Sequence, residues 1–125
     1  MNSALIVLIY FLTSTITYSQ SSILGTWQPE GQEAIFKIFE KDGKYYGQLI
    51  GSDNPEEDKQ IKKQSEIVLL SDIVKESDSI YCCGSFISPK NKKKANASII
   101  LRDKNTIELT VKKAWYSKSI TWHKI

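Results

Sequence analysis

Side chains able to do chemistry are few in this 125-residue chain, and they are scattered. His123 is the only histidine, and no other ligand is spaced with it as a metal site would require. The nucleophile pattern Gly-x-Ser-x-Gly does not occur. The sequence therefore predicts no catalytic residue, no metal site and no cofactor, and we expect a protein that is not an enzyme.

Cys82 and Cys83 are the only cysteines, and they are adjacent. Neighbouring strand residues face opposite sides, and their Cα atoms lie about 3.8 Å apart, closer than in ordinary disulfides. A bond between the two would be strained. We therefore expect one thiol in the core and one outside, with a bridge to a second molecule as the alternative.

The charge pattern argues against nucleic acid as a partner. The chain has 17 Lys and Arg against 14 Asp and Glu, but Arg102 is its only arginine. Bidentate recognition of phosphates and bases favours arginine over lysine. Four of the lysines, Lys90, Lys92, Lys93 and Lys94, gather in one segment, which we interpret as a solvated turn, with contact to an anionic surface as the alternative.

Residues 4–12 form an apolar run that is followed by small and polar residues. This arrangement is typical of a secretory signal peptide cleaved near Ser19-Gln20, and the run is shorter than the roughly 20 residues of a membrane-spanning helix. We expect an exported protein, periplasmic or secreted, that does not span the membrane. Residues 1–19 are then the signal peptide, and residues 20–125 are long enough for one domain.

Two hairpins are predicted with their registers. Asp42-Gly43 suits a two-residue turn with positive φ, and residues 103–105 suit a three-residue turn in which Asn105 is left-handed. The first turn pairs Lys41 with Lys44, Ile38 with Gly47 and Phe36 with Leu49, whereas the second pairs Leu101 with Ile107, Ile99 with Leu109 and Ala97 with Val111. The outer face of the first hairpin, with Phe39 and Tyr46, is too apolar to be fully wet.

Other short segments bring the total to about eight strands, and residues 53–65 interrupt them. There Asn54 and Pro55 suit the start of a short helix or polar loop, since Asn caps a helix and Pro fits its first position. Eight antiparallel strands joined by short turns predict an all-β fold, a small antiparallel up-and-down β-barrel, because closure removes exposed edges. A two-sheet sandwich is the alternative.

The segments Gly25-Thr26-Trp27, Tyr45-Tyr46-Gly47 and Thr121-Trp122 resemble the DUF2147 family of exported bacterial proteins. The resemblance implies a barrel of the lipocalin or calycin type and carries no established activity. It weakens in the middle of the chain, where Cys83-Gly84 and Ser88-Pro89 replace the usual residues. The triplet is also similar to the Gly-x-Trp signature of lipocalins, in which a basic residue of the last strand covers the Trp; by position Lys118 would do so here.

Two functions stay open at this point. The protein is a non-catalytic envelope or secreted interaction module that contacts an envelope protein through exposed Phe39, Tyr46 and Tyr116, or it binds a small apolar or lipid-like ligand inside the barrel. The residues expected to line the interior are Trp27, Phe36, Ile38, Tyr45, Leu49, Leu101 and Leu109. The residues expected to close one end are Gly25, Trp27, Lys118 and Trp122. The small residues Gly47, Gly84 and Ala97 would leave room for a ligand.

Overall fold

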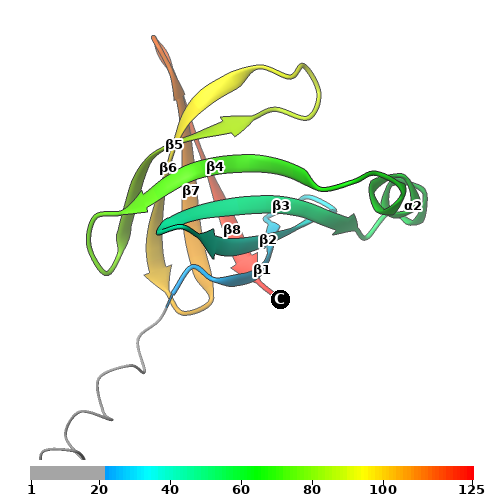
Figure 1. Ribbon diagram of the computed structural model, residues 1–125, viewed down its shortest axis with the longest axis horizontal. Helices are drawn as coiled ribbons and strands as arrows, with labels where there is room; N and C mark the ends of the chain where they lie inside the picture. The colour runs from blue at the N-terminus through cyan, green and yellow to red at the C-terminus, as the bar shows by residue number, and fades with distance from the viewer. Residues whose placement is uncertain (1–21) are drawn as a thin grey trace, which may run out of the picture.

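The computed structural model describes residues 22–125, which form eight strands and one helix (Figure 1). The strands are β1 (Gly25–Pro29), β2 (Ala34–Lys41), β3 (Lys44–Ser52), β4 (Ile67–Lys75), β5 (Ile80–Ile87), β6 (Lys94–Asp103), β7 (Thr106–Lys113) and β8 (Tyr116–Lys124). The helix, α2 (Pro55–Lys63), joins β3 to β4. The expected signal peptide and its cleavage point lie outside the described residues.

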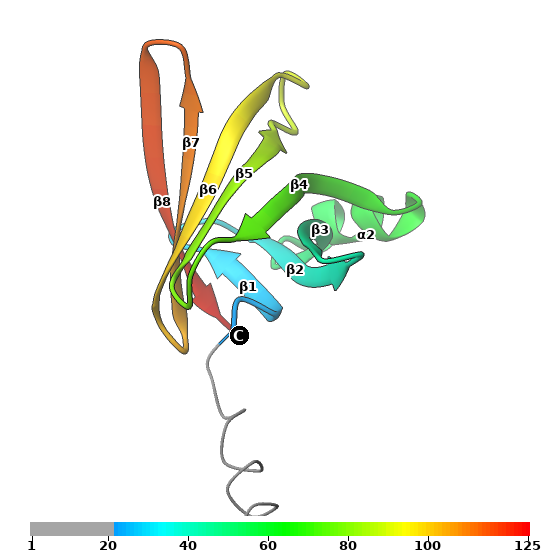
Figure 2. The same cartoon turned by 60° about the vertical axis from the view of Figure 1, so that its left-hand side comes forward.

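Each strand pairs antiparallel with the next one along the chain, and β8 pairs with β1 to close the barrel. This confirms the predicted up-and-down barrel of about eight strands and excludes the sandwich. Alternate connections fall at opposite ends. We call one end the mouth, which carries the β1–β2, β3–β4, β5–β6 and β7–β8 connections, and the other the closed end, where the C-terminus lies (Figures 1 and 2).

Both predicted hairpin registers are confirmed, because turn chemistry and alternation fix them locally. Asp42 and Gly43 have φ of 54° and 78°, and Phe36 pairs with Leu49 across the first hairpin. In the second hairpin Ile99 pairs with Leu109, but Asp103 pairs with Thr106, so the turn is shorter than expected. The expected left-handed Asn105 is wrong, since its φ is not positive.

Helix α2 begins where its capping residue predicts. The Asn54 side chain accepts hydrogen bonds from the backbone N–H groups of Glu56 and Glu57, and Pro55 occupies the first turn. Asp58 ties the helix to β3, because its carboxylate accepts a bond from the Ser52 backbone N–H at 3.0 Å. A hydrogen bond from the Lys62 side chain, together with the one from Ser52, holds the pKa of Asp58 below its usual value. Among residues 22–125 no helix is long and apolar enough to cross a membrane.

The hydrophobic core fills the closed end. Trp27, Ile73, Tyr81 and Ile107 are fully buried there, together with Ile23 from the segment before β1. The Trp27 indole N–H donates to the Ile23 carbonyl oxygen at 2.9 Å, which satisfies the one polar atom of that side chain. The core therefore occupies only part of the barrel length, and the mouth end is packed differently.

Candidate functional site

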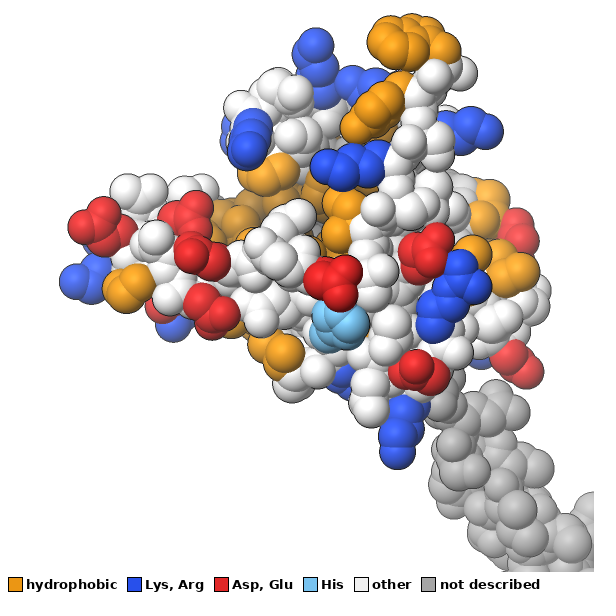
Figure 3. Space-filling view, turned by 180° about the vertical axis from the view of Figure 1, so that it is seen from behind, with side chains coloured by type: hydrophobic (Ala, Val, Ile, Leu, Met, Phe, Trp, Pro, Cys, Tyr) orange, Lys and Arg blue, Asp and Glu red, His pale blue; other side chains and the backbone are white. Residues whose placement is uncertain are grey.

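The mouth of the barrel contains an open cavity of about 1040 Å³. Figure 3 shows it as a hollow with hydrophobic side chains inside, bordered by the helix-bearing end of the sheet and by the β7–β8 hairpin. We call this cavity the cup. It is lined by residues of β2, β3, β5, β6, β7 and β8 and by residues of α2. Its volume is at the upper end of the range of about 300–1,000 Å³ usual for small-molecule sites.

The floor of the cup is an aromatic layer. The ring of Phe36 lines the cup and stacks on Trp122, with 4.6 Å between the ring centroids. Trp122 is 1% exposed, and it belongs to the core beneath. Stacked aromatic rings resist displacement because they combine a large buried area with a favourable mutual geometry. The floor is thus rigid, and a ligand would rest on Phe36 without entering the closed end.

Of the predicted interior residues, Phe36 and Leu49 line the cup. The others are inside the barrel but in the packed core, so they do not face the cavity: Trp27, Ile38, Tyr45, Leu101 and Leu109. Burial raises the pKa of Tyr45 and Tyr81, whose rings meet edge to face. Both phenols therefore stay neutral at physiological pH.

The expectation that small residues leave room for a ligand is wrong at the two glycines. A Cβ at Gly47 would lie 2.9 Å from the Leu70 Cβ, and one at Gly84 would lie 2.3 Å from the Ser71 carbonyl oxygen. The space over both glycines is already occupied by β4, which approaches more closely than a side chain would permit. The third small residue, Ala97, is buried in the core.

Sequence reasoning missed most of the apolar lining of the cup. Its further members on the strands are Ala34, Phe86, Ala95, Val111 and Ile120, of which the predicted register of the second hairpin already places Val111 on the inner face with Ala97. Alternation along the strands is the signal that points to them. Val111 is two residues from the buried Leu109, and Phe86 is two from the buried Gly84, so each faces the interior.

Four lysines stand around this apolar lining. Lys90 and Lys93 come from the β5–β6 turn, and Lys113 and Lys118 come from the β7–β8 hairpin. Figure 3 shows Lys and Arg side chains gathered along this part of the rim. The acidic residues that line the cup, Glu33 and Glu57, belong to the β1–β2 turn and to α2 on the other side. The rim is therefore divided into a basic and an acidic side.

The Gly-x-Trp triplet has a steric explanation at the closed end. Lys124 places its Nζ 5.4 Å from the centroid of the Trp27 ring, a cation–π arrangement. Gly25 has φ of 136°, and a Cβ there would lie 2.8 Å from the Lys124 Cε. The absence of a side chain at Gly25 thus leaves room for the aliphatic part of Lys124 to reach the Trp27 ring. The expected basic residue, Lys118, is wrong, because β8 pairs Lys124 with Trp27 and carries Lys118 to the rim of the cup.

The expectation for the two cysteines is also wrong, because Cys82 and Cys83 form a disulfide with each other and neither lies in the core. A β-bulge explains this. Tyr81 pairs with Ile99 and Gly84 with Ala97, so β5 has one more residue than β6 between the two pairs. Cys83, with φ of 70°, lies in this bulge, where the alternation of inward and outward side chains along β5 is interrupted.

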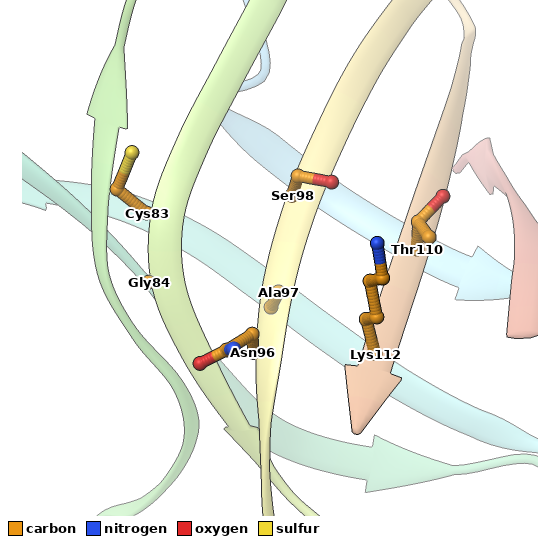
Figure 4. Close-up of a pocket in the computed structure, with 7 residues that line it drawn as sticks. All are labelled: Cys83, Gly84, Asn96, Ala97, Ser98, Thr110 and Lys112. Carbon is orange, nitrogen blue, oxygen red and sulfur yellow. The ribbon is translucent and has the colours of Figure 1, made fainter. Parts of the chain in front are cut away.

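Three other groups of polar residues lie outside the cup. A depression of about 380 Å³ lies on the outer face of β5, β6 and β7, where Lys112 extends toward Ser98 and Thr110 (Figure 4). It lacks large apolar side chains.

Glu76, Cys82 and Cys83 lie close enough together to resemble a metal site within the described part of the chain. The two sulfur atoms are bonded to each other, so they are not free thiolate ligands. His123 is exposed and faces Glu30 at 3.2 Å. The cup remains the better candidate.

Comparisons with known proteins agree with this architecture. A family model described as an uncharacterised protein conserved in bacteria, DUF2147, matches residues 25–124. The solved structure of protein HP1028 from the human pathogen Helicobacter pylori, described as belonging to the lipocalin family, is similar in fold, with a TM-score of 0.69 and 18% identity. The similarity covers 85% of this chain and 84% of that one. No curated protein matches the chain. The match over nearly the whole barrel, together with the closed eight-stranded topology, shows that the chain is a lipocalin-like member of the DUF2147 family.

Proposed function

We propose that this protein binds one small amphiphile in the cup, with the apolar body of the ligand on the floor and an anionic head at the basic side of the rim. The observation that carries the proposal is the open cavity of about 1040 Å³ above the stacked Phe36 and Trp122 rings. The proposed role is non-catalytic and lies outside the cytoplasm. The Cys82–Cys83 disulfide supports this compartment, because disulfides persist in oxidising surroundings.

The apolar body of the ligand is inferred from the lining. Phe36, Phe86, Val111 and Ile120 present aromatic and branched aliphatic groups to the cavity. Exposing such an apolar surface to water costs about 25 cal/mol of free energy per Å². A bound hydrocarbon chain would cover the surface and remove this cost. The closed end is filled, so the ligand is expected to enter and leave through the mouth only.

The anionic head is inferred from the charges. Lys113 and Lys118 stand on the β7–β8 hairpin, with Lys90 and Lys93 facing them from the neighbouring turn. Lys118 makes no salt bridge within residues 22–125, and the same holds for the other three lysines. A carboxylate or phosphate at this side of the rim would provide the missing counter-charge. The opposite side, with Glu57, would repel it.

A surface-contact function through Phe39 and Tyr46 has weaker support. The two rings stack on each other at 5.7 Å, and the Tyr46 hydroxyl donates to the Asp72 carboxylate at 3.3 Å. These contacts reduce the exposure of the two rings, which are half-buried on the outer face of the first hairpin. The pair therefore offers less free apolar surface to a partner than two separate aromatic side chains would.

Filling the cup tests the proposal. We expect Ala95→Trp to abolish saturable binding of a fluorescent long-chain fatty acid, because Ala95 lines the cup and an indole there would occupy the space. Ala114→Trp is the matched control, since Ala114 is exposed in the β7–β8 turn and outside the cup. Titration by fluorescence measures both. Equal binding by the two variants would place the ligand elsewhere and refute the proposal.

Charge reversal tests the position of the head. We expect Lys113→Glu with Lys118→Glu to weaken fatty-acid binding about tenfold, since partly exposed charge pairs contribute up to about 1 kcal/mol each. The affinity of the corresponding long-chain alcohol, measured by competition with the fluorescent fatty acid, should change by less than about twofold, because the alcohol has no charged head group to interact with the lysines. Lys41→Glu with Lys104→Glu, in the two turns at the closed end, gives the same charge change as a control. An equal loss for acid and alcohol would rule out an anionic head at this rim.

A further inference from the structure

We propose that the tip of the β7–β8 hairpin and the β5–β6 turn dock this protein on the surface of a bilayer that contains anionic lipids. The docking surface comprises Trp115 and Tyr116 at the hairpin tip and the lysines of the two connections. The proposal goes beyond ligand binding and does not depend on what the cup holds. It does imply that the mouth faces the membrane.

The first observation is the exposure of Trp115. Its side chain is 92% exposed, the largest fraction of any large hydrophobic residue between 22 and 125, and Tyr116 beside it is 49% exposed. The other two tryptophans, Trp27 and Trp122, are buried. The β7–β8 hairpin projects from the barrel beside the β5–β6 turn (Figure 2). A tryptophan with so little buried area contributes little to folding, whereas Trp and Tyr are enriched at the headgroup level of membranes.

The second observation is the sign of the charge around the tip. Residues 88–95 and 112–119 contain seven lysines and no Asp or Glu. The two segments are neighbours in space, because Asn96 pairs with Lys112 where β6 begins and β7 ends. Basic residues near an anionic lipid surface each strengthen binding, and the effect is additive at short range. An aromatic tip lies beside two segments that carry only positive charges. This combination fits an anionic membrane better than a neutral one.

The third observation is that the basic turn is preformed. The backbone N–H of Lys92 donates to the Ser88 carbonyl at 2.9 Å, and the N–H of Ser88 donates to the Lys93 carbonyl at 2.9 Å. The Asn91 side chain accepts a third bond, from the Lys93 N–H. Because these bonds fix the turn, its lysines are presented together without a large ordering cost on docking. Helix α2, on the other side of the mouth, carries equal numbers of acidic and basic residues, so it adds no net positive charge to the docking surface.

Vesicle binding tests the proposal on residues 20–125, which contain the whole closed barrel and omit the apolar run that would bind lipid by itself. We expect sedimentation with vesicles of mixed phosphatidylcholine and phosphatidylglycerol, weakened by salt, and none with phosphatidylcholine alone. Tryptophan emission should shift to the blue with the anionic vesicles, because Trp115 is the exposed tryptophan. Trp115→Ser should remove the shift and most of the binding.

Charge variants separate docking from ligand binding. Lys92→Glu with Lys94→Glu, both at the β5–β6 turn, should lower the partition coefficient about thirtyfold, because each basic residue near the surface contributes about fivefold. Neither residue lines the cup, so fatty-acid binding should stay unchanged in this variant and in Trp115→Ser. Lys41→Glu with Lys104→Glu, at the closed end, should dock like the native chain.

Three outcomes would overturn the proposal while leaving ligand binding intact. The first would be that the native chain fails to bind anionic vesicles, and the second that the tip and turn variants bind as well as the native chain. The third would be that the native chain is a dimer that Trp115→Ser converts to a monomer. In the last case the tip contacts a second copy of the chain and not a membrane.

Discussion

Replacing Trp27 by alanine is expected to lower the free energy of unfolding by about 3–5 kcal/mol, the usual cost of deleting a large buried aromatic side chain. Trp27 is fully buried, and the cavity would be lined on one side by Ile23, whose carbonyl oxygen would also lose its hydrogen bond. Domains of this size are stable by only about 5–15 kcal/mol. We therefore expect a fall in Tm of roughly 15–25 °C by calorimetry or circular dichroism.

Trp115→Ala provides the matched control, because it makes the same change at a side chain that is 92% exposed. Surface substitutions of this kind usually change the free energy of unfolding by no more than about 0.5 kcal/mol. A loss below about 1 kcal/mol for Trp27→Ala would contradict the burial of Trp27, and with it the packed closed end.

Adding a single methyl group at Gly84 is the second change with a large expected effect. The new Cβ of Gly84→Ala would lie 2.3 Å from the Ser71 carbonyl oxygen and 2.6 Å from the Ile73 Cδ1. Overpacking in a core costs typically about 1–3 kcal/mol, and here β4 itself has to move because one of the atoms belongs to the backbone. We expect a loss of about 3 kcal/mol in the free energy of unfolding, measured by urea denaturation.

Gly31→Ala separates this steric effect from conformational strain. Gly31 has φ of 71° and no atom within 4 Å of the position of a Cβ, so its substitution costs only the left-handed backbone, about 1–2 kcal/mol. Gly84 has no positive φ, so its cost is purely one of space. If Gly84→Ala proved as stable as the native chain, β4 could not lie against β5 as described.

Features set by neighbouring residues could be predicted from the sequence. Asp42-Gly43 determines the first hairpin from the Lys41–Lys44 pair to the Phe36–Leu49 pair, beyond which a bulge shifts the register, and Asn54 with Pro55 determines the start of α2. Alternation then gives the inner face of each strand and the barrel that joins them. Burial follows in the same way, which is why Trp27 and Trp122 are found inside as expected.

Features set by distant strands could not be predicted. Whether the space over Gly47 is empty depends on Leu70 of β4, and the lysine over Trp27 depends on the register of β8 against β1. The disulfide depends on a bulge in β5, and the pattern of apolar and polar residues in β5 gives no sign of that bulge. The basic side of the rim was missed for the same reason. Lys90 and Lys93 look like residues of a solvated turn until the fold brings them to the rim beside Lys118.

The barrel is sealed between its first and last strands, where Trp27 pairs with Lys124 and the Ile125 N–H donates to the Thr26 carbonyl. This seam cannot form until Lys124 has left the ribosome, so the growing chain has no complete barrel at any earlier moment. Pairings between distant residues are also the slow ones to form. The pairing of β8 with β1 is thus the step that closes the barrel, and until it forms the sheet keeps two unpaired edges.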